Sequence, residues 1–162
     1  MGAGKTTIGR LVARELGVAF VDTDELIRAR AGPVAALFAR GGEACFREAE
    51  FDAVRAALAG SVSVLALGGG AVTHARTRAL LAERALRVYI EVPVETLLAR
   101  LRRSRTVRPV LGAETTAARI RELMVQREPL YRESEIIVHG PRRSKTALAL
   151  EIAGRIQSHL AR

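Results

Sequence analysis

Hydrophobic residues follow two spacings along the chain, and the two spacings alternate. Some stretches place apolar residues every three or four positions, as on one face of a helix, and others are short continuous apolar runs, as in a buried strand. The helical spacing covers 8–16, 24–30, 33–38, 43–58, 73–83, 93–101, 117–132 and the segment from 144 onwards. The apolar runs cover 18–21, 62–67, 87–91 and 136–138. This alternation predicts an α/β fold with a mainly parallel sheet.

Glycine, proline and serine mark several boundaries in this pattern. We expect Gly17 to end the first helix, Pro129 to kink or break the last turns of the helix 117–132, and Ser144 to cap the final helix. The stretch 102–116 is basic and lacks a regular spacing, which predicts a mobile loop. No repeat or linker interrupts the chain, so residues 1–162 are predicted to form a single domain.

Composition agrees with a globular domain. The 162 residues are 49% hydrophobic and 27% charged, which is ordinary for a chain that buries a core. No apolar run approaches the roughly 18 residues of a membrane span, and no signal peptide is visible. The single cysteine, Cys45, excludes an internal disulfide framework and fits a reducing compartment. We therefore expect a cytoplasmic monomer without a membrane partner.

The net charge of +9 raises the alternative of a nucleic-acid-binding protein. Basic residues are spread along the chain, however, and few aromatic residues could stack on bases, with no Trp, two Tyr and four Phe. All the basic residues except Lys5 and Lys145 are arginines, which bind phosphate and carboxylate groups through paired hydrogen bonds. A small anionic substrate explains the surplus at least as well, and we predict no nucleic-acid partner.

The most informative motif is Gly-Ala-Gly-Lys-Thr-Thr at residues 2–7. It matches the second half of the phosphate-binding loop G-x-x-x-x-G-K-[ST], in which backbone N–H groups surround the β-phosphate. Lys5 is expected to reach the β- and γ-phosphates, and the Thr6 hydroxyl to bind Mg²⁺. A chance glycine turn before a helix is the alternative. The predicted nucleotide-binding residues here are Gly2, Ala3, Gly4, Lys5, Thr6 and Thr7.

The first glycine of that motif, and the strand that would feed the loop, fall before Met1. Two explanations are open: the sequence begins after them, or a different segment supplies the strand. We favour the first, because the pattern after Lys5 is intact.

Two acidic residues, Asp22 and Asp24, follow the apolar run 18–21. The carboxyl edge of a parallel sheet is where ligands bind, so one carboxylate is predicted to hold Mg²⁺ through water and the other to orient or deprotonate a hydroxyl. The alternative is an ordinary helix cap by Asp22 or Thr23.

Four further motifs are candidates for contact with a ligand. Arg47, with Glu43 or Glu50 to fix its guanidinium, and Arg127 are candidate carboxylate clamps, although a surface ion pair or a helix-dipole partner would look the same. The glycines 68–70 follow a strand and would let a ligand approach the backbone, or would form a simple turn. Arg108 lies in the loop 102–116, which on closing could neutralise a transferred phosphoryl group.

Together these motifs resemble those of shikimate kinases. The match runs from Gly2 to about Arg143. In order, it comprises Gly-Ala-Gly-Lys-Thr-Thr, Asp-Thr-Asp, Phe-Arg-x-x-Glu, Leu-Gly-Gly-Gly-Ala-Val, Thr-Val-Arg-Pro-Val-Leu and Arg-Glu-Pro-Leu-Tyr. The resemblance implies a three-layer P-loop kinase fold of the nucleoside-monophosphate-kinase type, with a five-stranded parallel sheet flanked by helices. The first of those strands is missing from this chain, so two strand pairs would lack the partner that they share.

The resemblance also implies a function: ATP-dependent phosphorylation of the 3-hydroxyl of shikimate in aromatic amino-acid (chorismate) biosynthesis, with Mg²⁺. It implies a substrate-binding region at about 22–50 and a lid at about 102–116. By matching position, the catalytic residues are Lys5, Asp24 and Arg108. The substrate-binding residues are Asp24, Arg47, Gly68, Gly69, Gly70 and Arg127. Thr6 and Asp22 serve the metal, Arg108 contacts the phosphates, and Arg143 lies near adenine.

Two alternatives remain open from the sequence. A gluconate-type sugar-acid kinase would share the loop and the fold, but the paired arginines and the glycine run argue against it. A catalytically inactive relative that serves as a binding module would explain the incomplete loop motif, but the reactive side chains after that motif are all retained.

Overall fold

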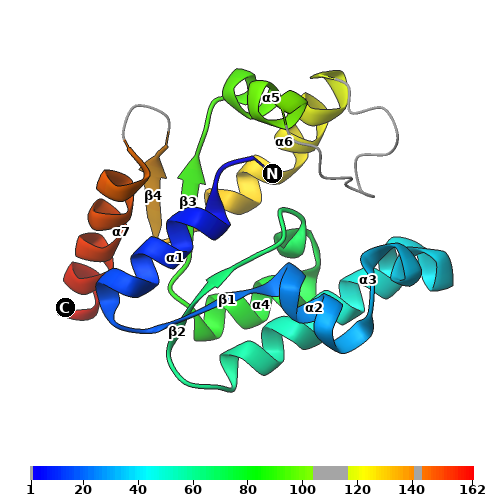
Figure 1. Cartoon of the computed structure of the whole chain (residues 1–162), viewed down its shortest axis with the longest axis horizontal. Helices are drawn as coiled ribbons and strands as arrows, with labels where there is room; N and C mark the ends of the chain where they lie inside the picture. Colours follow the sequence, from blue (N-terminus) through cyan, green and yellow to red (C-terminus); the bar gives the residue numbers. More distant parts are fainter. Residues whose placement is uncertain (1, 104–116, 141–143) are drawn as a thin grey trace.

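The computed structural model describes residues 2–103, 117–140 and 144–162, where helices and strands alternate as the hydrophobic spacing predicts (Figure 1). The helices are α1 (Lys5–Leu16), α2 (Thr23–Ala31), α3 (Val34–Leu58), α4 (Ala75–Arg84), α5 (Val94–Arg103), α6 (Ala117–Tyr131) and α7 (Lys145–Leu160), with a short 3₁₀ helix, η1 (Ala71–Thr73), before α4. The strands are β1 (Ala19–Asp22), β2 (Ser63–Ala66), β3 (Val88–Glu91) and β4 (Ile136–His139). The predicted α/β class is confirmed.

The strands form two separate parallel pairs. β1 pairs with β2, with Asp22 opposite Ala66, and β3 pairs with β4, with Glu91 opposite His139. Within the described residues no ladder of hydrogen bonds joins the two pairs. The structure describes four strands, so the five-stranded sheet remains a prediction.

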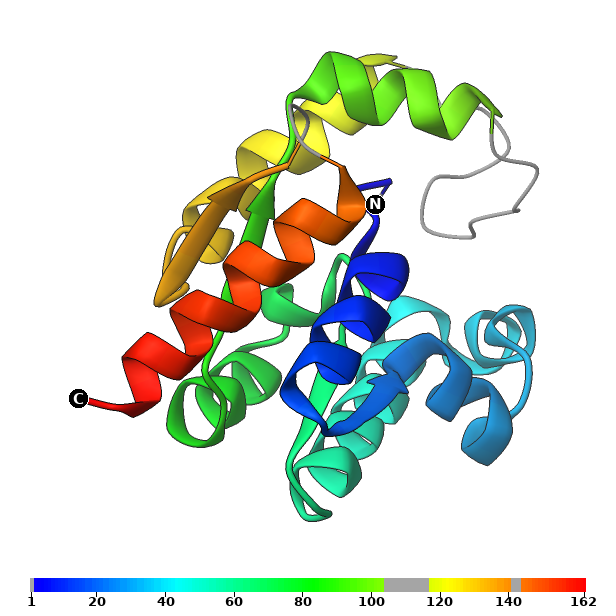
Figure 2. The same cartoon turned by 60° about the vertical axis from the view of Figure 1, so that its left-hand side comes forward.

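Helix α1 connects the two strand pairs through the main hydrophobic core. Its buried residues Ile8 and Val12 pack in one cluster with Val138 of β4 and Leu148 of α7, and Val64 of β2 packs against the same cluster. α1 and α7 lie side by side (Figure 2). Burial of each large apolar side chain stabilises the fold by about 1.5–3 kcal/mol, so this core holds the two strand pairs in place.

Two smaller hydrophobic clusters hold together the helix pairs α2–α3 and α5–α6, which lie on either side of the N-terminal end of α1. Ile27 of α2 packs with Leu37 and Phe46 of α3, and Leu98 of α5 packs with Leu123 of α6. In both views the N-terminal end of α1 lies between these two helix pairs (Figures 1 and 2). The fold therefore brings the glycine-rich loop to the junction of the two helix pairs.

The two helices predicted at 33–38 and 43–58 both occur within α3, and they meet at a kink. Gly41 and Gly42 have non-helical angles, and Gly42 has a φ of 63°, which a residue with a Cβ adopts only at a cost.

Within the described part of the chain, no helix is long and apolar enough to cross a membrane.

Pro129 does not break α6, which continues to Tyr131. A proline in a helix removes one N–H donor and leaves the carbonyl four residues earlier without its partner. That carbonyl belongs to Val125, whose residue is 75% exposed, so water can replace the lost hydrogen bond. The predicted break is therefore wrong.

Gly17 ends α1 and Ser144 caps α7 as predicted, with Ser144 Oγ accepting the N–H of Ala147 at 3.1 Å.

We expect Glu135→Gln to make the free energy of unfolding less dependent on pH in acid. The carboxylate accepts hydrogen bonds from the guanidinium of Arg87 at 2.6 Å and from its backbone N–H at 2.8 Å. The side-chain hydrogen bond from Arg87 is the largest cause that lowers the pKa of Glu135 to about 2. A carboxyl whose pKa folding lowers adds stability above its unfolded pKa, and this stability is lost as the pH falls through the folded pKa. The free energy of unfolding should thus fall more steeply in the wild type than in the variant between pH 4.5 and about 2.

Urea unfolding across that pH range measures this difference. Glu83→Gln is the matched control, because its carboxylate pairs with Arg84 at 3.4 Å in an exposed position. Equal slopes for the wild type and Glu135→Gln would contradict the assignment.

Candidate active site

The loop before α1 has the features of a phosphate-binding site. Gly4 caps the helix with a φ of 88°, in the left-handed region that favours glycine. α1 begins at Lys5 and carries no acidic residue in its first turn, so the positive end of the helix dipole meets no carboxylate of its own. Backbone N–H groups at such a helix start bind anions, and the side chain of Lys5 adds a positive charge beside them.

Thr6 and Asp22 connect this loop to the end of β1. The Thr6 hydroxyl donates a hydrogen bond to Asp22 Oδ2 at 2.8 Å, while Oδ1 accepts the backbone N–H groups of Asp24 at 3.0 Å and Glu25 at 3.4 Å and so caps α2. Asp22 is therefore both a helix cap and a partner of the loop, with one oxygen for each. A hydroxyl and a carboxylate are hard oxygen donors, which suit Mg²⁺ together with nucleotide phosphates.

No group of three acidic, histidine or cysteine side chains that could hold a metal occurs among the described residues. A Mg²⁺ ion beside Thr6 and Asp22 would therefore need further ligands from phosphates or water, as is usual for Mg²⁺ at phosphate sites.

The glycine run at 68–70, between β2 and η1, forms a turn against which the candidate substrate residues converge. The Gly68 N–H donates to the hydroxyl of Thr23 at 3.2 Å, and that hydroxyl donates to the carbonyl of Ala66 at 3.2 Å. A Cβ at Gly68 would lie 2.5 Å from Glu50 Oε1 and 3.2 Å from Asp24 Oδ1. The absence of a side chain here lets both carboxylates approach the backbone.

Arg47 is held at this turn by two carboxylates of its own helix. Its guanidinium donates to Glu50 Oε2 at 2.6 Å and to Glu43 Oε1 at 2.8 Å, and the residue is 7% exposed. A Cβ at Gly70 would overlap this guanidinium, with 2.8 Å to Cζ. Burial opposes its charge, but Glu50 and Glu43 outweigh that effect, so the pKa of Arg47 lies above its usual value. The predicted contacts of the Arg47 guanidinium with Glu43 and Glu50 are confirmed. Arg47 is a buried cation rather than half of a surface ion pair.

Glu50 is fully buried and has one oxygen without a partner. Oε2 binds Arg47, whereas no described residue donates a hydrogen bond to Oε1. Burial raises the pKa of Glu50 above the usual carboxyl value, although Arg47 opposes this shift. A buried acceptor of this kind costs free energy, and Oε1 lies close to the backbone of Gly68.

Arg127 and Tyr131 approach the same turn from α6. Nη1 of Arg127 donates to the carbonyl of Gly69 at 3.2 Å, and the Tyr131 hydroxyl donates to the same carbonyl. Tyr131 stacks on Tyr89 of β3, with ring centroids 5.2 Å apart. Burial raises the pKa of Tyr131, which keeps its hydroxyl a donor. The guanidinium of Arg127 has five N–H donors, so one contact with Gly69 leaves others to bind an anion.

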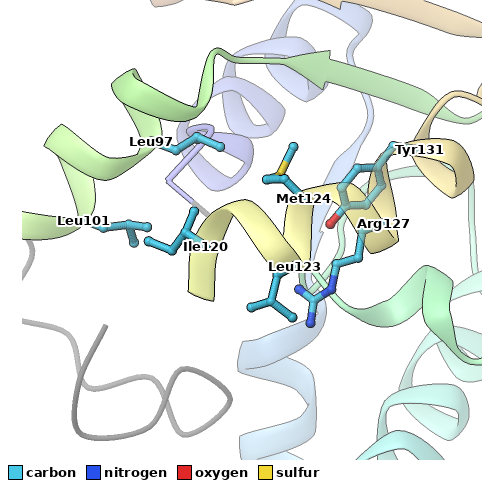
Figure 3. Close-up of a pocket in the computed structure, with 7 residues that line it drawn as sticks. All are labelled: Leu97, Leu101, Ile120, Leu123, Met124, Arg127 and Tyr131. Carbon is cyan, nitrogen blue, oxygen red and sulfur yellow. The ribbon is translucent and has the colours of Figure 1, made fainter. Parts of the chain in front are cut away.

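A small hollow next to Arg127 and Tyr131 is too narrow for a substrate (Figure 3). Its apolar lining comes from Leu97, Leu101, Ile120, Leu123 and Met124 of α5 and α6. Its volume of about 10 Å³ is about the space of one water molecule. The polar groups that could bind a ligand therefore lie at the glycine turn rather than in this hollow.

Most of the predicted site residues come together in the structure. The turn Gly68–Gly70 brings Asp24, Arg47 and Arg127 to one place, and the contact between Thr6 and Asp22 joins that place to the glycine-rich loop. Arg108 and Arg143 lie outside the described residues, as does most of the proposed lid.

Thr23 and Tyr131 were not among the site residues predicted from the sequence. Thr23 is fully buried and stands between the two aspartates, at the first position of α2. Tyr131 follows Arg127 by four residues, a spacing that puts two helical side chains on one face. These positions are the signals that could have identified them.

Comparison with known proteins identifies the family. The family model described as shikimate kinase matches residues 1–157. A shikimate kinase of Nitrobacter winogradskyi is 45% identical over 139 residues, which cover 85% of this chain and 64% of that protein, just under two thirds of its length. A shikimate kinase of Mycobacterium avium is 44% identical over 157 residues, or 96% of this chain and 88% of that protein.

Solved structures agree with the sequences. The shikimate kinase from Acinetobacter baumannii in complex with shikimate superposes with a TM-score of 0.91 at 37% identity, covering 98% of this chain and 89% of that one. The shikimate kinase from Bacteroides thetaiotaomicron gives a TM-score of 0.86 at 30% identity, covering 100% of this chain and 94% of that one. By sequence, fold and the arrangement of its site, this chain belongs to the shikimate kinase family.

Proposed function

We propose that the protein transfers the γ-phosphoryl group of ATP to the 3-hydroxyl of shikimate. One observation carries this proposal: Asp24, Arg47 and Arg127, which lie far apart in the sequence, meet at the Gly68–Gly70 turn beside the loop that begins α1. Its relative from A. baumannii was solved with shikimate, an acid with one carboxylate and three hydroxyls.

Arg47 and Arg127 are the proposed partners of the substrate carboxylate. Both are buried, at 7% and 6% exposure, where a bidentate pair with a carboxylate is stronger than in water. Glu43 and Glu50 fix the plane of the Arg47 guanidinium before a ligand arrives, so little rotational freedom is lost on binding.

Asp24 is the proposed base or orienting group for the attacking hydroxyl. Its backbone N–H is held by Asp22 at 3.0 Å, and its Oδ1 lies at the edge of the glycine turn. Gly69 and Gly70, with Gly68 beside them, would offer backbone contacts to the substrate. A site of this composition should discriminate strongly against analogues that lack the carboxylate or a hydroxyl, because its own buried polar groups would then remain unpaired.

The loop at the start of α1 is the proposed phosphate site. Backbone N–H groups of residues 2–7 and the side chain of Lys5 would hold the β- and γ-phosphates. Thr6 and Asp22 would hold Mg²⁺, which supplies charge neutralisation at the phosphates when it is bound. Within the chain itself, the hydrogen bond between Thr6 and Asp22 orients both groups toward the loop.

Other expectations remain proposals. These are the roles of Arg108 at the phosphates and Arg143 near adenine, the lid at about 102–116, and a cytoplasmic monomer without a nucleic-acid or membrane partner.

A coupled assay for ADP release tests the proposed function. The purified protein with Mg-ATP is given shikimate, gluconate or no acceptor. We expect release that depends on shikimate and is absent with gluconate. Release with gluconate would favour a sugar-acid kinase. No release with either acceptor, together with tight binding of Mg-ATP and shikimate, would indicate an inactive binding module.

A further inference from the structure

Three hydroxyl groups contact the Gly68–Gly70 turn. The hydroxyl of Thr73, in the adjoining η1, donates to the carbonyl of Gly70 at 2.7 Å, whereas those of Thr23 and Tyr131 reach the turn from other elements. We propose that Thr23 and Tyr131 are positioning residues for shikimate, because their hydroxyls together set the direction of the backbone amides in this turn. The proposal rests on the proposed function and adds to it two residues that act through the glycine turn.

Thr23 fixes the first end of the turn. Its hydroxyl accepts the N–H of Gly68 and donates to the carbonyl of Ala66, both at 3.2 Å, and the residue is completely buried. The same hydroxyl thus connects the end of β1 to the loop after β2. Since Asp22 and Asp24 flank Thr23, this contact also fixes the distance between the two carboxylates and the turn.

Tyr131 fixes the peptide between Gly69 and Gly70. Its hydroxyl donates to the carbonyl of Gly69, which also accepts from Arg127. In a trans peptide the carbonyl of one residue and the N–H of the next point in opposite directions, and the described residues contain no cis peptide. The Gly70 N–H therefore points away from α6, on the opposite side of the peptide plane from Tyr131.

The stacking of Tyr131 on Tyr89 makes this contact directional. The rings lie 5.2 Å apart at centroid and 27° from parallel, so β3 limits the rotation of the Tyr131 ring. Arg127 alone can donate to Gly69 or turn toward an anion, whereas the Tyr131 hydroxyl keeps the carbonyl bound when Arg127 engages a carboxylate. The turn should then remain oriented in the liganded protein.

Tyr131→Phe and Thr23→Val remove the hydroxyls and keep the shapes of the side chains. We expect each to raise the KM and the Kd for shikimate about tenfold, the effect of losing one buried hydrogen bond that orients a binding group. For Tyr131→Phe, kcat and the KM for ATP should change by no more than about twofold, because the hydrogen bond that it removes involves neither Asp24 nor the loop at the start of α1. Thr23→Ser, which keeps the hydroxyl, should restore most of the affinity.

Matched controls separate positioning from general destabilisation. Tyr89→Phe removes a hydroxyl from the stacked partner ring without a contact to the turn. Thr77→Val removes a fully buried hydroxyl that contacts His74 at 3.0 Å, away from the turn. Both controls should bind shikimate like the wild type, and thermal unfolding establishes that all variants are folded.

A measurement without ligand keeps the proposal separate from the proposed function. In the free protein, hydrogen exchange of the Gly68 amide should accelerate in Thr23→Val and not in Thr23→Ser, and the Gly70 amide resonance should shift in Tyr131→Phe and not in Tyr89→Phe. The proposal is overturned if these amides do not respond, or if the wild type phosphorylates shikimate and both variants match their controls. A wild type that releases no ADP overturns the proposed function, while the amide measurement still decides whether the hydroxyls orient the turn. If Thr23→Val does not fold, Tyr131→Phe decides the outcome.

Discussion

Asp24→Asn is expected to lower shikimate-dependent ADP release by about a thousandfold, within the range by which a positioned general base accelerates proton transfer. Asparagine has the shape of aspartate but cannot accept a proton from the attacking hydroxyl. Its backbone N–H would still bind Asp22, so the start of α2 and the stability of the fold should be preserved. Steady-state kinetics with shikimate and calorimetric titration with Mg-ATP measure the two effects.

An exposed carboxylate elsewhere in the chain provides the control for this prediction. Asp52→Asn removes an exposed carboxylate of α3 that pairs with Arg55 at 3.1 Å, and we expect its turnover to equal that of the wild type. Near-normal turnover of Asp24→Asn, with Mg-ATP binding unchanged, would show that the role assigned to Asp24 is wrong.

Arg47→Met should lower both stability and shikimate affinity. The change leaves the carboxylate of Glu50 buried without its cation, which typically costs about 3–5 kcal/mol of the free energy of unfolding. Because burial raises the pKa of Glu50, protonation in mild acid should neutralise this group first, and the deficit should shrink as the pH is lowered. Loss of one of the two carboxylate clamps should also weaken shikimate binding by about a hundredfold.

Two comparisons test the cause of the deficit. Arg47→Met combined with Glu50→Gln should recover much of the stability but none of the affinity, since the buried charge is gone and the clamp is still missing. Arg55→Met breaks an exposed pair on the same helix and should change stability by no more than about 0.5 kcal/mol. If Arg47→Met unfolds at the same urea concentration as the wild type, the buried pair with Glu50 does not have the assigned importance.

The order of elements followed from the sequence because local patterns determine it, and so did the position of Asp22, Asp24 and the glycine run directly after strands. The run 18–21 ends at Asp22, and the run 62–67 leads into the glycine turn. Once two parallel strands pair in this register, their carboxyl ends must lie together. Placing Asp24 beside Gly68 therefore required only the strand assignments and the parallel direction.

Other features depend on contacts that no local pattern records. The sequence left the role of Asp22 open, and the structure shows that one carboxylate oxygen caps α2 while the other accepts the hydroxyl of Thr6. The helical continuity through Pro129 depends on the exposure of Val125 to water. The importance of Thr23 depends on its reaching across to Ala66 and Gly68, which lie more than forty residues away in the chain.

The separation of the strands into two pairs has a practical consequence for work with this chain. Within the described residues each pair ends in open edges, whose backbone N–H and C=O groups can template pairing with another molecule. Leu65 of β2 and Ile90 of β3 are only partly buried, so apolar surface accompanies the open backbone. We therefore expect the protein to aggregate at high concentration. Kinetic measurements should be most dependable on dilute samples monitored by light scattering.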